Sequence, residues 1–501
     1  MSPPPINHGG SRSHDTDFVV IGSGIGGLCC AALLAKYGYR VTVCESHYLA
    51  GGAAHSFEVK GFKFDAGPSF FLGIGGEPGD GSVNPLKQWV VYPPEGDSFP
   101  NIASQRSYED TIARRGGPEA LRQWRALDVA MKPLQTAAGL FPAAALRADP
   151  GVLLTAARFL GPEMMGMGFI APTLTGPFSA LVDKHVSDPW LRAYLDLEMG
   201  GSKAIVDALL RGIKKHGGRI LLRSHVQEIL MEGGRASGVI LRPSGPAGSN
   251  SSSGRGGGGG PELIRARCGV VSNASVWDTQ RMLPAGAAPA DWAQASEATP
   301  ALESFVHLHL GIDAAGLPPD LECHHLVVND WQRLTAPQNV IIASIPTVFD
   351  PSLAPPGKAT VHCYCAANEP YGPWAGMDRR SAAYKAFKEE RAQPLWKALE
   401  RVIPDIRQRA ELTLVGSPLT HERFVRRHRG SYGPGISAAG DQTWPGPKTP
   451  IPGLSVCGDS CMPGIGVPAA AASGMITANS LANVFSHLRM MDALLPPARA
   501  A

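Results

Sequence analysis

The sequence lacks the long apolar runs that membrane-spanning helices need. A span requires about 18 or more consecutive apolar residues, and no uninterrupted run of this length occurs, so no bilayer-spanning helix is expected. Residues 1–16 are rich in Pro, Ser and Gly, lack the apolar centre of a signal peptide, and are expected to be disordered. At 501 residues the chain is too long for one ordinary core, so two or three domains are expected.

Dense positive charge is also missing. The formal net charge is +3, and the densest basic cluster, between Arg423 and Arg429, is too short to follow a phosphate backbone. We therefore expect no nucleic-acid partner.

Cysteine and histidine patterns typical of metal sites are scarce. The nine cysteines are scattered, and Cys363-x-Cys365, with His362 beside it, lacks a second pair at zinc-site spacing. Buried thiols in a reducing compartment are the favoured interpretation. His307 and His309 alternate on one face of an expected strand, but no carboxylate or third histidine follows at metal spacing. We therefore expect no metal, and a polar pocket lining for these two histidines.

A recognisable catalytic motif is absent as well. Neither a Ser-His-Asp arrangement nor a pair of carboxylates is visible in the sequence. The catalytic residues therefore stay unknown at this level, and His307, His309 and His421 are only weak candidates.

The sequence does contain a nucleotide-binding pattern near its start. Residues 18–21 form a short apolar run typical of a buried strand, and Gly22, Gly24 and Gly27 follow at the spacing G-x-G-x-x-G. The first glycine permits a tight turn, and the second lets a pyrophosphate approach the bare backbone. The third lets the next helix, expected at 28–37, pack closely on the sheet, with its first amides facing the phosphates.

A second strand, an acid and a second glycine pair extend this pattern. Residues 40–44 are typical of a strand that delivers Glu45, whose carboxylate can hold both ribose hydroxyls of an adenosine. Because strand, glycines, helix, strand and acid occur in order, dinucleotide binding is favoured over a glycine-rich turn in an unrelated α/β unit. Gly51-Gly52 suits a chain that lies along a flavin's phosphate and ribityl arm, where side chains would collide with it.

Elements far along the chain complete the predicted FAD site. A strand at 454–457 precedes Asp459, whose carboxylate can accept a ribityl hydroxyl. An Ala-rich helix begins at Val467, and its N-terminal dipole can face the flavin pyrimidine, where negative charge builds on reduction. In the middle of the chain, the backbone around Val226 is expected to pass the adenine.

These elements predict an α/β fold with a Rossmann-like FAD-binding domain of glutathione-reductase type and an interleaved α+β substrate domain. A low-complexity loop separates strands expected at 237–241 and 263–271, so it predicts a disordered hairpin tip. The expected division is a disordered N-terminus at 1–16, FAD-binding pieces at 17–90, 201–290 (with the disordered loop 243–261) and 426–490, a substrate- or membrane-facing helical region at 91–200, a substrate domain at 291–425 and a tail at 491–501.

One segment of the helical region is almost uncharged. Residues 159–182 carry Glu163 as their single charge, and Pro162, Pro172 and Pro177 rule out one continuous spanning helix. Two interpretations stay open. The segment is either a buried wall of the substrate domain or a surface segment that dips into a membrane and admits an apolar substrate.

The combined motifs resemble the carotenoid isomerase branch of the phytoene-desaturase superfamily, and within it the carotenoid isomerase-like proteins of plants and algae. The matching stretches are GSGIGGLCCAALLAKYG, ESHYLAGGAAHSF, GFKFDAGPS, VVSNAS, PLTHERF, GSYGP and CGDSCMPGIGVPAAAASG. The resemblance covers nearly everything from Asp17 to the end of the chain. It is most specific in the glycine-rich motifs near both ends.

The resemblance implies one non-covalent FAD, a long apolar polyene substrate and attachment to plastid membranes from one side. In the isomerases of this branch the flavin must be reduced although no net electrons are transferred. The implied activity is cis–trans isomerisation of a polyene such as poly-cis-lycopene. The alternatives are a redox desaturase or saturase of carotenoids or retinoids, and a non-catalytic carotenoid-binding flavoprotein. Carried over by motif, the implied FAD contacts are Gly22, Ser23, Gly24, Gly26, Gly27, Glu45, Gly51, Gly52, Val226, Asp459 and Val467.

The chain departs from this branch at two points. A strand-helix piece is absent between Gln88 and Trp89, and a segment that helps to wall the substrate site is absent between Leu197 and Glu198. These departures leave the expected FAD domain intact and affect the expected substrate channel.

Overall fold

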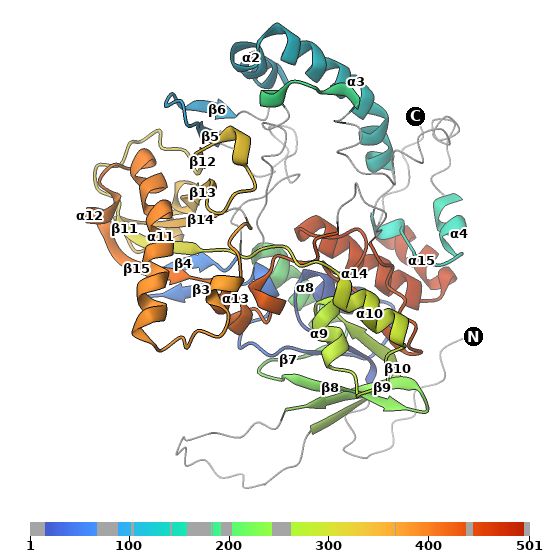
Figure 1. Ribbon diagram of the computed structural model, residues 1–501. Helices are drawn as coiled ribbons and strands as arrows, with labels where there is room; N and C mark the ends of the chain where they lie inside the picture. Colours follow the sequence, from blue (N-terminus) through green and yellow to red (C-terminus); the bar gives the residue numbers. More distant parts are fainter. Residues whose placement is uncertain are drawn as a thin grey trace.

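The computed structural model describes residues 16–67, 89–101, 105–140, 143–157, 182, 184–191, 203–242, 262–365, 367–436 and 444–494. Within these residues the chain forms two large sheets, each covered by helices (Figure 1). The predicted α/β architecture is confirmed.

The first sheet has the strand order β7-β2-β1-β10-β9-β8, and β16 also pairs with β10. The pairs β1–β2, β2–β7, β1–β10 and β10–β16 are parallel, whereas β8, β9 and the start of β10 form an antiparallel meander. Parallel pairing buries both faces of the central strands, as their continuous apolar sequences require. The strands are β1 (Thr16–Ile21), β2 (Val41–Cys44), β7 (Arg219–Leu221), β8 (Val226–Glu232), β9 (Arg235–Leu241), β10 (Glu262–Ser272) and β16 (Leu454–Val456).

Three helices pack together on one face of the first sheet. They are α1 (Ile25–Lys36), α8 (Lys203–Lys215) and α14 (Val467–Leu481), which share one apolar core. Their close approach depends on glycine, because a Cβ atom at Gly474 of α14 would lie 2.1 Å from the Gly26 carbonyl oxygen of α1. Helices α9 (Val276–Arg281) and α10 (Ala290–Ala298) follow β10 directly.

The second sheet has the order β15-β11-β14-β13-β12-β5-β6. Only the β5–β12 pair among these described strands is parallel. A separate hairpin, β3 (Ser56–Val59) with β4 (Phe62–Asp65), lies beside it. The strands are β5 (Trp89–Tyr92), β6 (Phe99–Asn101), β11 (His307–Asp313), β12 (His324–Val328), β13 (Val340–Ser344), β14 (Lys358–Cys365) and β15 (Ala410–Gly416).

Helices cover both faces of the second sheet. The long helix α11 (Ala382–Val402) shares one core with β11, β13 and β14, and the pair α2 (Gln105–Arg115) and α3 (Gly117–Leu140) shares another with β5, β12 and β13 (Figure 1). The remaining described α-helices are α4 (Val152–Ala157), α12 (Ile406–Arg409), α13 (Pro418–Phe424) and α15 (Val484–Leu494).

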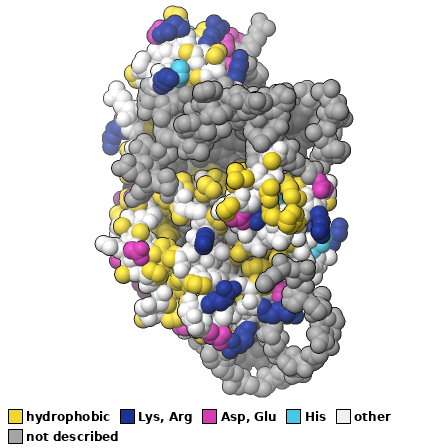
Figure 2. Space-filling view, turned by 90° about the vertical axis from the view of Figure 1, so that its right-hand side faces the viewer, with side chains coloured by type: hydrophobic (Ala, Val, Ile, Leu, Met, Phe, Trp, Pro, Cys, Tyr) yellow, Lys and Arg dark blue, Asp and Glu magenta, His cyan; other side chains and the backbone are white. Residues whose placement is uncertain are grey.

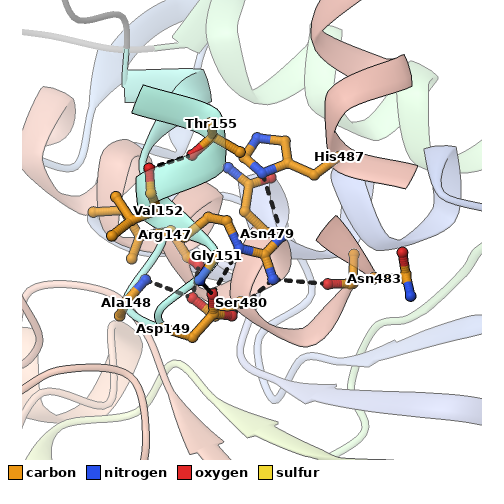
Figure 3. Close-up of polar contacts among 12 residues, drawn as sticks. Arg147, Ala148, Asp149, Gly151, Val152, Thr155, Asn479, Ser480, Asn483 and His487 are labelled. Carbon is orange, nitrogen blue, oxygen red and sulfur yellow. Dashed lines mark hydrogen bonds and ion pairs between the residues drawn. The ribbon is translucent and has the colours of Figure 1, made fainter. Parts of the chain in front are cut away.

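A polar network fastens the segment before α4 to helices α14 and α15 (Figure 3). The buried Arg147 guanidinium forms a two-pronged ion pair with Asp149, at 2.9 and 2.7 Å, and donates to the Ala482 carbonyl oxygen at 2.9 Å. The ring nitrogen Nε2 of His487 donates to the Ala144 carbonyl oxygen at 2.7 Å, so its Nδ1 accepts from Arg147. The network ties this segment to the helix whose first turn reaches the site described below.

Several expected boundaries change. The boundary between residues 90 and 91 falls inside β5, because β5 pairs with β12, more than two hundred residues later, and local patterns carry no sign of such pairing. β1 already begins at Thr16, and α15 continues to Leu494 into the expected tail.

The expectations for the β9–β10 hairpin and for the cysteines agree with the structure. Strands β9 and β10 form the predicted antiparallel hairpin, although its tip at 243–261 lies outside the described residues, as do residues 159–181 of the apolar segment. All nine cysteines are free, and all but Cys268 are buried, as predicted. Within the described part of the chain, no helix has the length and apolar character needed to cross a membrane.

Candidate functional site

A cavity of about 1660 Å³ extends from the carboxyl ends of β1 and β2 to the second sheet. This edge of a parallel sheet is where α/β folds bind their ligands. Nine of the eleven residues predicted to contact FAD line this cavity, and they come from both ends and the middle of the chain. Those lining the cavity are Gly22, Gly24, Gly26, Glu45, Gly51, Gly52, Val226, Asp459 and Val467, while Ser23 and Gly27 stand behind its wall.

The two glycine motifs form one cradle. Gly22 has a φ of +87°, which only glycine adopts easily, and a Cβ atom at Gly27 would lie 2.3 Å from the Gly22 carbonyl oxygen. The second pair lies directly on the first loop, since Gly51 N–H donates to the Ser23 carbonyl oxygen at 3.0 Å. A Cβ atom at Gly52 would approach the Gly24 Cα to 2.9 Å. The cradle is therefore bare backbone because side chains do not fit there.

Two helix N-termini open into the cavity. Helix α1 begins after Gly24 and helix α14 after Gly466, and neither cap residue has a side chain that accepts from the first-turn amides. Both cap glycines line the cavity. Helix N-termini carry unpaired N–H groups and a partial positive charge, so these two ends suit phosphate and a developing negative charge.

Glu45 lies at the end of β2 with its side chain almost completely buried. Its Oε2 accepts from the Ser23 amide at 2.8 Å and from the Ser23 hydroxyl at 2.6 Å, and its Oε1 accepts from the His47 amide at 2.7 Å. Ser23 is 0% exposed, so it positions the carboxylate instead of facing the cavity. Glu45 itself lines the cavity and keeps acceptor capacity for ribose hydroxyls.

Asp459 has a partner that sequence reasoning missed. Its Oδ2 pairs with Arg427 Nη2 at 2.6 Å, and both residues line the cavity. Arg427 also donates to the backbone oxygens of Ser431 and Tyr432, which holds its position. Arg427 belongs to the basic cluster at 423–429, and that cluster is the sequence signal that could have identified it.

Asn273 is a second missed residue. It follows β10 and lies directly under the glycine cradle, where Cβ atoms at Gly24 and Gly26 would each come within 2.8 Å of its side-chain amide. Its backbone N–H donates to the Ile21 carbonyl oxygen at 2.9 Å, so it crosses the end of β1. A polar residue at the carboxyl end of a predicted parallel strand is the signal that could have identified it.

The end of the cavity toward the second sheet carries a group of apolar side chains. Leu326, Val340 and Ile342 present buried side chains there, and Phe305 and Tyr432 add aromatic surface. Typical ligand pockets have volumes of about 300–1,000 Å³, so a cavity of about 1660 Å³ has room for a cofactor and a second molecule. An apolar wall of this kind suits a ligand that is itself apolar.

The expected polar lining by His307 and His309 is wrong. Both are buried behind Phe305 and, like His421, do not line this cavity. Burial lowers the pKa of His309 to about 4 and that of His421 to about 3, so both are neutral at pH 7. The sequence shows no third histidine at metal spacing, but the fold brings one to these two, because His362 of β14 lies opposite His309 of β11.

The geometry as a whole fits FAD. The glycine cradle and two uncapped helix ends suit the pyrophosphate and the pyrimidine, Glu45 suits the ribose, and Asp459 suits the ribityl chain. These groups line one continuous cavity.

Comparisons with known proteins agree with this site. Residues 20–79 match the NAD(P)-binding Rossmann-like domain, and residues 107–482 match the flavin containing amine oxidoreductase family. The chain is 30% identical to prolycopene isomerase 2, chloroplastic, of an Oncidium hybrid cultivar, over 84% of this chain and 76% of that protein. It is 26% identical to human all-trans-retinol 13,14-reductase, over 83% and 77% of the two chains.

A solved structure gives the same fold. The oxidoreductase from Methanosarcina mazei superposes with a TM-score of 0.52 at 20% identity, covering 91% of this chain and 98% of that one. The family match covers most of the chain, and its flavin agrees with the cavity. This chain therefore belongs to the flavin containing amine oxidoreductase family, as a carotenoid isomerase-like member with FAD as its cofactor.

Proposed function

We propose that this chain is an FAD-dependent carotenoid cis–trans isomerase that acts on a long polyene such as poly-cis-lycopene. The observation that carries this proposal is the single cavity that joins the glycine cradle of the first sheet to the apolar wall of the second. A flavin and a long apolar molecule can share that space. The similarity to a protein named prolycopene isomerase supports the substrate class.

The chain's own residues hold and shield the reactants. The uncapped starts of α1 and α14 and the carboxylates of Glu45 and Asp459 would hold the cofactor. When bound and reduced, FAD supplies an electron or proton donor to a conjugated double bond. Leu326, Val340 and Ile342 would exclude water from the polyene, which keeps a transient charge out of bulk solvent.

Incubating the dithionite-reduced protein with tetra-cis-lycopene tests this activity. We expect geometric isomers of unchanged mass, separated by chromatography and identified by mass spectrometry. Leu334→Glu places a charge in the cavity wall at a half-buried position and should retain FAD while losing turnover. The matched control Leu263→Glu, on β10 outside the cavity lining, should keep both. Equal turnover by the two variants would show that the polyene does not use this wall.

A redox activity on a carotenoid or retinoid is the second candidate, because of the similarity to a retinol reductase. A reductase adds two hydrogen atoms across a double bond and consumes one reduced flavin per product. The same incubation separates the two activities. A product heavier by two hydrogens, with matching loss of reduced-flavin absorbance, would replace the isomerase proposal.

A non-catalytic carotenoid-binding flavoprotein is the third candidate. It is motivated by the segments that the family resemblance implies to be missing after Gln88 and Leu197, two positions outside the described residues. Inserting the corresponding segment of a relative and finding turnover only in the repaired chain would support this candidate. Turnover by the chain as it stands would remove it.

We infer a plastid location from the relatives named chloroplastic. A fluorescent protein fused to the C-terminus of this chain should enter chloroplasts, and exclusion from them would overturn this inference.

We further propose that the protein contacts the membrane on the face formed by α4 and α15. Leu153 and Leu154 of α4 are 74% and 55% exposed, and Phe485 of α15 is 62% exposed. Hydrophobic side chains gather on this face of the molecule (Figure 2). Beyond α4 the sequence leads into residues 159–182, whose single charge is Glu163. An enzyme that acts on a water-insoluble polyene must take its substrate from lipid. Exposed apolar residues on one face would let the protein bind the lipid surface.

A further inference from the structure

Buried histidines gather behind the Phe305 wall, outside the cavity described above. His307 and His309 come from β11 and His362 from β14. Because these strands pair with His309 opposite His362, the three side chains emerge on one face of the sheet. The ring centroids of His309 and His362 are 4.2 Å apart, and those of His307 and His362 are 4.9 Å apart.

The distances between these rings suit a shared ion. One nitrogen from each ring can be chosen so that all three lie within 4.8 Å of one another. Tetrahedral Zn²⁺ with bonds of about 2.0–2.1 Å holds its ligand nitrogens roughly 3.3 Å apart. The rings of His309 and His362 lie nearly parallel, with an interplanar angle of 10°, so the side chains must rotate out of this stack before their nitrogens can ligate one ion.

The hydrogen bonds of the cluster support this interpretation. His309 Nε2 lies 3.0 Å from the Asp65 carbonyl oxygen, so Nε2 carries the proton and Nδ1 is left as the acceptor. Metal-binding histidines commonly donate their second nitrogen to a carbonyl in this way. His307 Nδ1 lies 2.6 Å from His362 Nε2, while His307 Nε2 is buried without a hydrogen-bond partner among the described residues.

A fourth histidine lies beside these three. His421 of α13 lies next to the set, with its ring centroid 4.6 Å from that of His307 and its Nε2 also buried without a hydrogen-bond partner in the described structure.

We propose that His307, His309 and His362 form a binding site for one divalent transition-metal ion, with Zn²⁺ as the first expectation. Imidazole ligands suit Zn²⁺, Cu²⁺, Fe²⁺ and Ni²⁺, whereas they do not suit Mg²⁺ or Ca²⁺. Three imidazoles leave one position for a water molecule or for His421. None of the three proposed ligands lines the flavin cavity, so the proposal stands apart from the isomerase activity.

Metal content tests the proposal directly. The FAD-loaded full-length protein is stripped with a chelator, dialysed against Zn²⁺, and analysed for metal by plasma mass spectrometry and titration calorimetry. We expect one Zn²⁺ per chain. His362→Ala should weaken Zn²⁺ binding by more than the 10–100-fold typical of losing an outer-shell partner, because it removes a ligand itself. Mg²⁺ should not compete.

Matched variants separate a site from general damage. His325→Ala removes another buried histidine of the same sheet, outside the cluster, and should keep Zn²⁺ binding. Flavin absorbance and circular dichroism report folding for every variant. If His362→Ala does not fold, His307→Gln, which preserves a polar group, serves as the second test. If the wild-type protein takes up no Zn²⁺, or if the folded cluster variant binds as tightly as His325→Ala, the cluster is a hydrogen-bonded stack only and the proposal is wrong.

Discussion

Gly24 combines three structural features of the expected cofactor site. It caps α1, lines the cavity, and lies so close to Asn273 that a Cβ atom would come within 2.8 Å of the amide nitrogen Nδ2. Gly24→Ala therefore both displaces Asn273 and places a methyl group where the pyrophosphate would approach. We expect FAD affinity to fall at least tenfold, about 1.4 kcal/mol, measured as flavin absorbance per mole of purified protein.

Gly212→Ala provides the control for this substitution. Gly212 lies in α8, and an added Cβ would meet nothing within 4 Å, so that variant should keep its flavin. Full yellow occupancy in Gly24→Ala would contradict the assignment of the cradle.

Two neighbouring residues of β12 make stability depend on pH. Burial lowers the pKa of His324 and of His325 to about 4, from an unfolded value of about 6.5. The folded state therefore keeps both rings neutral, while the unfolded chain takes up protons below pH 6.5. Their contribution to stability is complete above pH 6.5 and is lost as the pH falls toward 4.

Urea unfolding at a series of pH values between 7 and 4 measures this dependence. His325→Gln removes one titrating group, so the slope of the unfolding free energy against pH should decrease by up to about 1.4 kcal/mol per pH unit in this range. An unchanged slope would mean that the ring is protonated in the folded protein.

At the scale of elements, the network around Arg147 connects the chain before α4 to α14 and α15. The Arg147 side chain is 4% exposed and contacts Asp149, the Ala482 carbonyl oxygen and the ring of His487. Arg147→Met keeps most of the length but leaves the buried acceptors on Ala482 and His487 without this donor and removes the ion pair with Asp149. We expect a loss of about 2–3 kcal/mol in the free energy of unfolding, and faster hydrogen exchange in residues 143–157.

The exposed pair Arg122–Glu119 supplies the comparison for this variant. Both of its side chains are exposed to solvent, so Arg122→Met should leave the unfolding transition unchanged. Equal effects of the two substitutions would show that the network around Arg147 does not stabilise the packing of the chain before α4 against α14 and α15.

At the scale of the whole molecule, the proposed membrane face predicts binding to lipid. Inserting one apolar side chain contributes roughly 1.5–3 kcal/mol, so Leu153, Leu154 and Phe485 together suffice for reversible attachment. Phe485→Asp should weaken sedimentation with liposomes about tenfold or more while leaving FAD bound. Phe349→Asp removes another exposed phenylalanine on a different part of the fold and should not weaken it. Liposome binding that is absent, or equal in both variants, would contradict the proposed face.

The sequence alone determined those parts of the protein that depend on close neighbours in the chain. Glycine at positions 22, 24 and 27 and the helix beginning at 467 each meet a local backbone requirement, either a positive φ, the absence of a Cβ atom or a free helix end. The acid at 45 directly follows the short strand β2. Such requirements restrict the residue type at the position itself. The glycine positions of the cradle could therefore be predicted from the sequence.

Only the tertiary structure decided which distant residues meet. β5 joins β12, Arg427 pairs with Asp459, and His362 lies opposite His309, and each of these contacts depends on strand register or loop closure between separate parts of the chain. Many sequences support such pairings, since a sheet partner needs only a compatible apolar or polar face. The histidine cluster stayed invisible for this reason: its third member is 53 positions from the second in the sequence and directly opposite it in the sheet.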